Sequence, residues 1–577
     1  MKLPMEPKNE GELLSEVALG RVAPDSVIVN GTLFNVFTGE FIEKQSIWIK
    51  SGMIAYVGPD SDPARDADTH FIDANGMVLL PGLIDGHTHV NRLGIEEFIR
   101  HVIPSGCTTV VMETSEFGMV AGTAGIGHFA EITRDQPIRL YYTAGPVCGL
   151  LPSTEARAPS PEEVLPFLRD PRCLGLGEVY WGNMFIEGSQ GDRVRALVKL
   201  MLDSGKRAEG HTAGATGKKL QAYTTFGFTS CHEPITEKEV LERLRLGYWA
   251  MIRQGSVRKE LDAIHSIFKR EIDFRRMVLV TDSVDPYGLI EEGYLDASLR
   301  TTLKLGVPPH IAYPMVTLNA AEHFRLDHFI GSLSPGKAAD LVLIPGATDY
   351  FPQLVMGGGR ILFQDGTRLV EPRKVVSPDL LLNTVRIKTP IFSLPPRQGK
   401  ARVMELVTRL VTRESIVNLD DPEEAWDTIT VLAMERFGTG KTFAGLLKGF
   451  GLERGAYGST MTWDTTDLIV VGCDLQSIHT VIGRLRTLRG GAVYAVGDQI
   501  AAEIATPYCG YLSLDPLTEI YEKIRYLEAA LKSNGVRWEK PCLTIDTLTT
   551  PAIPHLRITH EGYVRLKDHQ LLPIKCI

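Results

Sequence analysis

The chain has 577 residues, 44% of them hydrophobic and 23% charged, with a formal net charge of -9. A chain of this length is too long for one compact core and is expected to form two to four packed domains. Lysine and arginine are scattered along the chain, which argues against a nucleic-acid partner. With neither a signal-peptide pattern at the start nor an apolar run long enough to cross a bilayer, we expect a soluble cytoplasmic protein with no membrane partner.

The N-terminal segment, residues 1–80, has the pattern of short strands. Apolar and polar residues alternate at residues 27–29 and 47–49, and the pairs Ser51-Gly52 and Asn75-Gly76 have the composition of hairpin-type turns. The sequence therefore predicts a small antiparallel sheet here, as the first part of a β-sandwich.

From residue 77 the pattern changes to apolar strands that alternate with amphipathic helices, which is typical of βα units. Capping boxes at Ser160 and Thr236 mark the starts of two helices. The glycines that end helices just before strands are Gly106, Gly205 and Gly227. Because the span is close to the length of about 250 residues that is typical of such folds, we predict a (β/α)8 TIM-like barrel over residues 81–330.

Turn and strand patterns return at residues 331–344, so we expect residues 331–390 to complete the N-terminal sandwich and the barrel to be an insertion. Residues 391–577 are predicted to form a C-terminal α+β domain. It is expected to have helices around residues 400–413 and 517–532 and strands at 467–472 and 491–496. The sequence does not indicate the role of this domain.

The eight cysteines are widely spread and include no C-x-x-C pair, which disfavours a zinc ribbon or a disulfide framework. We expect most of them to be reduced and buried. The same absence excludes the zinc deaminases that act on cytosine, which carry a P-C-x-x-C motif.

The strongest local motif is the sequence PGLIDGHTH at residues 81–89, in which an apolar strand ends in two histidines. Alternate residues of a strand point to the same side, so His87 and His89 can reach one metal ion at the mouth of the barrel, where barrel enzymes place their active sites. The alternative is that these two are surface histidines or core histidines with ordinary hydrogen bonds.

The same placement at strand ends recurs elsewhere in the sequence, which favours a metal site over ordinary surface or core histidines. Four more potential ligands stand where a predicted strand ends: Glu178, His211, His232 and Asp282. His101, His128 and Asp85 lack that placement and are expected to be helical, loop or structural residues. Asp85 is also a candidate to hold a ligand histidine through its second ring nitrogen, which metal sites commonly require.

Four imidazoles and two carboxylates exceed what one four-coordinate ion with an open position needs, so we predict two divalent ions bridged by Glu178 and a hydroxide. Such ions lower the pKa of bound water and polarise an electrophilic carbon. Asp282 could take the proton and pass it to the leaving group. Nitrogen and oxygen ligands suit manganese, iron and zinc alike, so the metal is not identified.

These residues resemble the amidohydrolase superfamily and, in detail, the bacterial adenine deaminase family, nearly end to end. The matching phrases lie at residues 81–89, 175–179, 210–211, 217–220, 244–247, 251–256, 318–319 and 449–455. Glu178, in place of a modified lysine, is a mark of that family. The resemblance implies a binuclear site on the six residues and the hydrolytic release of ammonia from C6 of adenine to give hypoxanthine. We also expect a homo-oligomer, a dimer.

The chain departs from the family where the substrate is expected. Asn91 and Ser283 stand where the family usually has Glu and Asp, residues 112–116 match an acidic stretch only in part, and residues 463–467 replace a histidine-containing phrase. Within residues 112–116, Glu116 matches a glutamate thought to touch the purine.

Five residues are therefore candidates for substrate binding: Glu116, Asn91, Ser283, Tyr180 and Trp181. Tyr180 and Trp181 directly follow Glu178 and could stack on a flat ring, although aromatic residues near a barrel rim also serve for packing. Cys231, beside His232, is read as strand packing, because a metal-bound hydroxide already supplies the nucleophile.

Three functions remain open. The first is an aminohydrolase that releases ammonia from adenine or a related aminated heterocycle by metal-hydroxide attack. The second is a cyclic amide (lactam or imide) hydrolase of the same superfamily, which would release no ammonia. The third is a catalytically impaired metal-binding homologue, an alternative that Asn91 and Ser283 keep open and that the complete set of metal ligands opposes.

Overall fold

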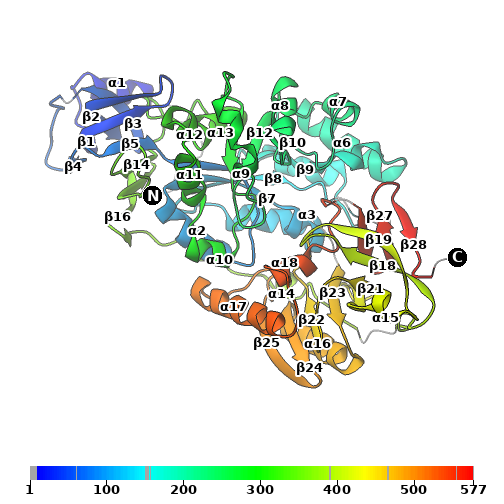
Figure 1. The fold of residues 1–577 in the computed structure, drawn as a ribbon. Coiled ribbons are helices and arrows are strands. Elements are labelled where there is room, and N and C mark those ends of the chain that lie inside the picture. The colour runs from blue at the N-terminus through cyan, green and yellow to red at the C-terminus, as the bar shows by residue number, and fades with distance from the viewer. Residues whose placement is uncertain are drawn as a thin grey trace.

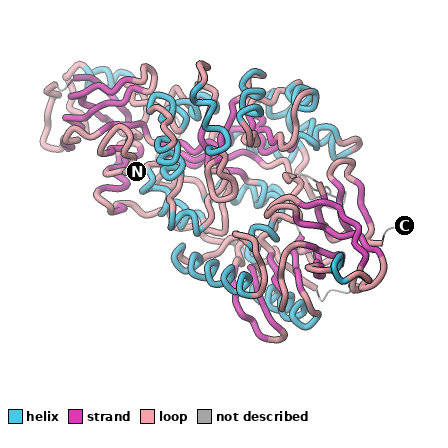
Figure 2. The backbone as a smooth tube through the Cα atoms, viewed as in Figure 1, coloured by secondary structure: helices cyan, strands magenta, loops and turns pink. Residues whose placement is uncertain are grey.

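The computed structural model describes residues 10–575, apart from residues 60, 148, 150–154, 156, 389–391, 464–466 and 554. An N-terminal sheet and a C-terminal domain lie on opposite sides of a central region of parallel strands and helices (Figures 1 and 2). Nowhere among these described residues does a helix combine the length and the hydropathy that a membrane span requires.

The N-terminal sheet has nine strands and is built from two distant parts of the chain. Its strands are β1 (Ser26–Asn35), β2 (Glu40–Lys50), β3 (Met53–Pro59), β4 (His70–Asp73), β5 (Val78–Pro81), β14 (Leu341–Ile344), β15 (Leu354–Gly357), β16 (Arg360–Gln364) and β17 (Thr367–Arg368). β14 pairs antiparallel with β5, which confirms that the later segment completes the N-terminal sheet. Because β5 also pairs with β1, hydrogen bonds join the two parts into one continuous sheet, and the two layers of a sandwich stay a prediction.

The two predicted turns of this sheet have different outcomes. Ser51-Gly52 joins the antiparallel strands β2 and β3, as predicted for a hairpin, and both residues have positive φ. Asn75-Gly76 also turns the chain with positive φ, but it joins β4 and β5, which each pair with β1 in parallel and not with each other. The prediction of a second hairpin was therefore wrong.

The central region contains two parallel sheets, of five and three strands. In chain order the strands are β6 (Leu83–Thr88), β7 (Cys107–Glu113), β8 (Arg139–Ala144), β9 (Cys173–Tyr180) and β10 (Arg207–His211), then β11 (Ser230–Cys231), β12 (Trp249–Arg253) and β13 (Met277–Val280). Strands of the two sheets meet at both borders, where β10 contacts β11 and β13 contacts β6.

Helices follow these strands along the chain. They are α2 (Ile95–Val102), α3 (Ser115–Ile132), α5 (Pro161–Val164), α6 (Ser189–Asp203), α7 (Lys218–Thr224), α8 (Glu237–Arg245), α9 (Leu261–Ile264), α10 (Pro286–Glu291), α11 (Leu295–Lys304), α12 (Pro309–Met315) and α13 (Leu318–His323). The capping boxes at Ser160 and Thr236 are both formed. The helix-ending glycines Gly106, Gly205 and Gly227 all have the positive φ that such ends favour.

A mixed sheet of eight strands is the largest element of the C-terminal part. Its strands are β18 (Lys400–Leu406), β19 (Thr412–Asn418), β20 (Thr428–Glu435), β21 (Thr442–Lys448), β22 (Ala456–Ser459), β23 (Asp467–Gly472), β24 (Gly491–Val496) and β25 (Gln499–Ala505). Around it lie α14 (Asp379–Leu382), α15 (Pro422–Ala425), α16 (Leu475–Leu488), α17 (Leu517–Ser533), α18 (Pro541–Asp546) and the small sheet of β26 (Leu556–Thr559), β27 (Gly562–Arg565) and β28 (Gln570–Leu572).

The strands predicted at residues 467–472 and 491–496 and the helix predicted at 517–532 are present as β23, β24 and α17. The helix predicted at residues 400–413 was wrong, because this segment forms β18 and the start of β19. Ala401 and Val403 are buried at alternate positions, and β18 pairs with β19 on one side and β21 on the other. Those tertiary contacts outweigh the helix propensity of residues such as Met404 and Leu406.

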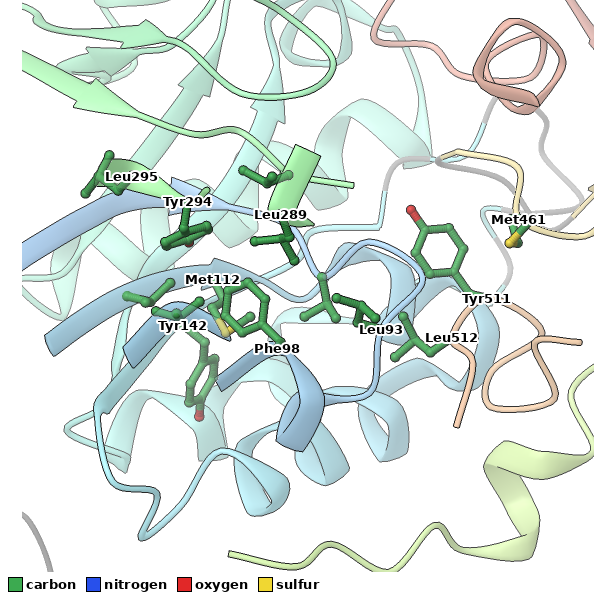
Figure 3. Close-up of a cluster of buried hydrophobic side chains, with 14 of the residues drawn as sticks. Leu93, Phe98, Met112, Tyr142, Leu289, Tyr294, Leu295, Met461, Tyr511 and Leu512 are labelled. Carbon is green, nitrogen blue, oxygen red and sulfur yellow. The ribbon is translucent and has the colours of Figure 1, made fainter. Parts of the chain in front are cut away.

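Apolar packing joins the C-terminal part to the central region (Figure 3). Leu93 and Phe98, near α2, belong to the same buried cluster as Tyr511 and Leu512 from the loop after β25. This contact places C-terminal loops directly beside the segment that follows β6.

The six described free cysteines are Cys107, Cys173, Cys231, Cys473, Cys509 and Cys542, all buried except the half-buried Cys473. These six agree with the prediction of reduced and mostly buried cysteines. Cys148 and Cys576 lie outside the described residues.

Candidate metal centre

The six residues predicted as metal ligands converge at the carboxyl ends of the parallel strands. Their positions are His87 in β6, His89 just after it, Glu178 in β9, His211 at the end of β10, His232 directly after β11 and Asp282 shortly after β13. Ligand atoms lie within 4.8 Å of one another in each of two overlapping groups, one of His87, His89 and Asp282 and the other of His87, Glu178 and His232. Strands separated by nearly two hundred residues of sequence thus build one cluster.

The carboxylate of Glu178 faces histidines on two sides. Its Oε1 lies 3.7 Å from Nε2 of His89, and its Oε2 lies 2.8 Å from Nε2 of His232 and 3.9 Å from Nε2 of His211. One oxygen of this carboxylate therefore faces His89, and the other faces His211 and His232.

Asp282 closes the cluster on the side of β6. Its Oδ1 lies 3.2 Å from Nε2 of His87 and 3.7 Å from Nε2 of His89, and its Oδ2 accepts a hydrogen bond of 3.3 Å from Arg253. The backbone N–H of Asp282 donates to the carbonyl of His87, which ties the ends of β6 and β13 together.

The cluster fits a divalent cation. Nε2 of His87 and Oε2 of Glu178 are buried and lack a well-oriented hydrogen bond, although buried polar atoms are nearly always paired. Burial raises the pKa of Glu178, but the charges of His211, His232 and His89, together with the short contact with His232, lower that pKa to about 2. Nitrogen and oxygen donors on a buried anionic carboxylate are the donor set that manganese, iron and zinc accept.

Two glutamates contact the Nδ1 atoms of His87 and His89. Oε1 of Glu113, the last residue of β7, lies 3.4 Å from Nδ1 of His87, and Oε1 of Glu116 lies 2.7 Å from Nδ1 of His89. Contacts of this kind fix the orientation of a ligating imidazole. Burial lowers the pKa of His89, but the charge and the hydrogen bond of Glu116, together with the charge of Glu178, raise it to about 10.

Asp85 does not hold a histidine ring, so that prediction was wrong. Its carboxylate accepts hydrogen bonds from the backbone N–H of His87, from both the backbone and the hydroxyl of Thr281, and from the hydroxyl of Tyr294. Asp85 points into the space between β6 and β13 and joins these strands below the cluster. It remains structural, as the other interpretation had it.

Sequence reasoning missed Glu233 and Arg253. Oε1 of Glu233 lies 3.2 Å from Nε2 of His211 and 3.4 Å from Nε2 of His232, and Arg253 pairs with Glu233, Asp282 and Glu260. Glu233 directly follows His232, and neighbouring residues in a strand point to opposite sides, so Glu233 was not expected beside His232 in the cluster. Because β11 ends at Cys231, that alternation does not apply to Glu233.

A cavity opens onto the cluster and is lined from both sides. The central region contributes His89, Glu116, Glu178, His211, Ala213, His232, Glu233, Arg253, Val257, Arg258, Asp282 and Ser283, and the C-terminal part contributes Leu410, Trp463, Tyr511, Ala552 and Ile553. The candidate metal ligands thus lie on one wall and mostly apolar side chains on the other.

Two substrate-binding candidates lie at this cavity and one lies behind it. Glu116 and Ser283 line the cavity. Asn91 lines an adjacent cavity that shares Val257 and Trp463 with the first, and its side-chain amide donates a hydrogen bond of 2.9 Å to the Ser283 hydroxyl. Two of the departures from the family pattern, Asn91 and Ser283, are therefore partners in one contact.

Tyr180 and Trp181 are absent from the described lining of either cavity. The ring of Tyr180 packs edge-on against His211, with centroids 4.7 Å apart, and the indole of Trp181 donates to the carbonyl of Ala213. The structure thus places both in packing positions, not facing the space for a substrate ring. Trp463 and Tyr511 are the aromatic residues that do line the cavity.

The remaining candidates lie outside the cluster, as predicted. His101 is on α2 beside Glu97, and His128 is on α3 beside Tyr508. Cys231 is buried in β11 against the hydroxyl of Thr212, and burial raises the pKa of its thiol. Of residues 463–467, the altered phrase of the C-terminal part, residues 464–466 lie outside the described residues.

Comparisons with known proteins agree with these features. Residues 78–362 match the Amidohydrolase family and residues 405–570 match the Adenine deaminase C-terminal domain. The chain is 31% identical to an adenine deaminase of Clostridium botulinum, over 96% of this chain and 95% of that one, and 32% identical to one of Moorella thermoacetica, over 96% of each. A solved β-aspartyl dipeptidase of Fervidobacterium islandicum is 19% identical, with a TM-score of 0.45, over 59% of this chain and 97% of that one. From the two deaminase matches, the chain belongs to the adenine deaminase family within the amidohydrolases.

Proposed function

We propose that the protein is a metal-dependent aminohydrolase that converts adenine and water into hypoxanthine and ammonia. The observation that carries this proposal is the position of Glu178, whose two oxygens face different histidines in a cluster at the strand ends. The curated relatives, 31% and 32% identical to this chain, are adenine deaminases.

The parallel strands are proposed to close into one (β/α)8 barrel over residues 81–330. Eight strands occur in chain order, and the two sheets contact each other at both borders. Residues 1–80 and 331–390 would flank this barrel, and residues 391–577 would form the C-terminal domain. A dimer and a cytoplasmic location stay predictions.

Two divalent ions are the proposed cofactors, with manganese, iron and zinc all compatible with the donors. His87, His89 and Asp282 would hold one ion, His211 and His232 the other, and Glu178 would serve both. Such ions supply Lewis acidity, which lowers the pKa of a water molecule in the site and polarises the carbon that is attacked.

The protein groups move the protons. Asp282 takes a proton from the attacking water and delivers it to the departing amine, while Arg253 holds the other oxygen of this carboxylate in place. A bond forms between the water oxygen and C6, and the bond from C6 to the amine nitrogen breaks. Glu116, at the cavity wall, is positioned to accept a hydrogen bond from a ring N–H.

The test is a screen of metal-reconstituted protein against adenine, related aminated heterocycles and ring amides, with ammonia release as the readout. Adenine should release ammonia, and Glu178→Gln should abolish this release and reduce the bound metal. Glu209→Gln is the matched control, because Glu209 is a buried carboxylate of β10 that pairs with His323 outside the cluster. Ring opening without ammonia would point to the cyclic amide hydrolase, and full metal with no turnover to an impaired homologue.

A further inference from the structure

Arg258 is a cation at the cavity whose side chain the protein leaves nearly unpaired. It lines the cavity of the metal cluster, and about a third of its side chain is exposed. Among the residues that the structure describes, its guanidinium makes no side-chain hydrogen bond, and its nearest carboxylate oxygen is Oε1 of Glu260, at 3.9 Å. That oxygen already lies 3.4 Å from Arg253.

Each carboxylate that lines the cavity contacts a histidine or Arg253 rather than Arg258. Oε1 of Glu116 contacts His89, Glu178 contacts His232, and both Glu233 and Asp282 contact Arg253. A guanidinium has five N–H donors and no acceptor. Arg253 directs its donors to carboxylates of the protein, whereas Arg258, five residues later, keeps its donors available.

The turn that carries Arg258 is held from the C-terminal side. Arg409 donates to the carbonyl of Val257 and Lys540 donates to the carbonyl of Ser256. Within the turn, the N–H of Gly255 donates to the carbonyl of Arg258 itself. Two ties to another part of the chain thus fix the backbone on which the guanidinium is mounted.

Because the proposed function places a flat aminated ring in this cavity, we propose that Arg258 is a specificity-determining residue that binds a hydrogen-bond acceptor on the ring edge away from the reacting amine. The inference rests on the proposed function for the presence of the ring. The acceptor is either a ring nitrogen or an exocyclic oxygen, and both present a lone pair to the same donors. Such a contact is charge-assisted and therefore strong for its size.

The experiment compares wild type, Arg258→Met and Arg258→Lys on adenine, on deaza analogues that lack single ring nitrogens, and on 2-oxoadenine. We expect Arg258→Met to lower kcat/KM for adenine about 10- to 100-fold, the range for a lost hydrogen bond to a charged group, with metal content unchanged. Arg258→Lys should recover part of this loss. Lys259→Met is the matched control, since Lys259 is an exposed cation of the same turn that pairs with Glu292.

The analogues identify the acceptor. If it is a ring nitrogen, one deaza analogue loses affinity for wild type but loses nothing further in Arg258→Met. If it is an oxygen, the penalty of Arg258→Met is largest on 2-oxoadenine. Equal activity of wild type and Arg258→Met on every ring, or a loss of the same size on all of them, would overturn the inference.

A failure of the proposed function is distinguishable from a failure of this inference. Wild type that releases no ammonia from any ring contradicts the aminohydrolase. Calorimetric binding of the same rings to the metal-loaded protein still tests Arg258, because the loss in Arg258→Met must again be confined to rings that carry the acceptor. Equal binding of every ring by wild type and Arg258→Met would refute the proposed contact between Arg258 and the ring.

Discussion

The two walls of the cavity differ in chemistry and in origin. One wall consists of charged side chains and candidate metal ligands at the ends of strands, such as Glu178, His232 and Asp282. The opposite wall is mostly apolar, and its residues, including Leu410, Trp463 and Ile553, come from loops of the C-terminal part. Only the first wall carries groups that can do chemistry, whereas the second can only shape what enters, so substitutions in the second wall should change selectivity without loss of the reactive groups.

The largest expected effect belongs to the charged wall. Asp282→Asn removes the proposed proton acceptor, and we expect kcat to fall about 10³-fold, within the range for loss of a general base. Metal content, measured by mass spectrometry on the same sample, separates loss of the proton acceptor from loss of a ligand. A variant that keeps both its metal and its activity would show that another residue accepts the proton.

Trp463→Ala should act on selectivity without touching the metal. Removing this ring from the cavity should raise KM and lower kcat/KM about 30-fold, because roughly 2 kcal/mol of buried aromatic contact with the substrate is lost. Trp426→Ala is the matched control, since Trp426 is 62% exposed on the same part of the chain. Equal effects of the two substitutions would mean that Trp463 serves only the stability of the C-terminal part.

The difference between the walls also explains what the sequence could predict. An apolar strand that ends in, or is closely followed by, His, Glu or Asp is a local signal, so His211 and Asp282 could be placed without a structure. Glu113 carried the same signal, as the last residue of β7, and could have been found. Residues such as Leu410 and Ile553 carry no signal, because loops have no periodicity and meet the cluster only through tertiary packing.

The fold, too, was predictable only where the signal is local. Long amphipathic patterns such as α17 were predictable, whereas the segment that forms β18 was assigned to a helix. Its pairing with β19 and β21 is not visible in local propensity. Contacts between segments distant in the sequence are what the local pattern lacks.

The pair of Asn91 and Ser283 lies where the walls meet, and a smaller effect is expected there. Loss of their hydrogen bond should cost about 1 kcal/mol, which is about fivefold in kcat/KM, in either Asn91→Ala or Ser283→Ala. Because Asn91 is absent from the described lining of the metal-site cavity and contacts Ser283, the double variant should be little worse than either single one. Additive losses would instead mean that each residue contacts the substrate by itself.

One buried and one half-buried ion pair hold the two walls together. Arg92, three residues after His89, pairs with Asp546 at 2.7 Å, and Asp285, three residues after Asp282, pairs with Lys540 at 2.7 Å. Both ties attach a loop that follows a candidate metal ligand to the C-terminal part. The apolar wall is therefore fixed relative to the cluster by the same loops that carry the chemistry.

The smallest expected effect concerns a further tie, at Glu97 of α2. Its carboxylate accepts hydrogen bonds from the N–H of Leu517, which starts α17, and from His101 and Arg100. The hydrogen bond from His101 lowers the pKa of Glu97, burial raises it, and the bonds from Leu517 and Arg100 lower it further, to about 2. A carboxyl whose pKa is lower in the folded protein stabilises the fold above its unfolded pKa of about 4.5, and this stabilisation disappears as the pH falls towards the folded value.

Glu97→Gln should therefore reduce stability at pH 7 by about 1 kcal/mol, after allowance for solvent screening. Its deficit relative to wild type should shrink as the pH falls below about 4.5, because the protonated glutamic acid comes to resemble glutamine. Calorimetric unfolding at a series of pH values measures this difference, with Glu522→Gln as the control on the exposed face of α17. A deficit that stays constant from pH 7 to pH 3 would show that the charge of Glu97 does not hold α17 against the wall that carries the metal cluster.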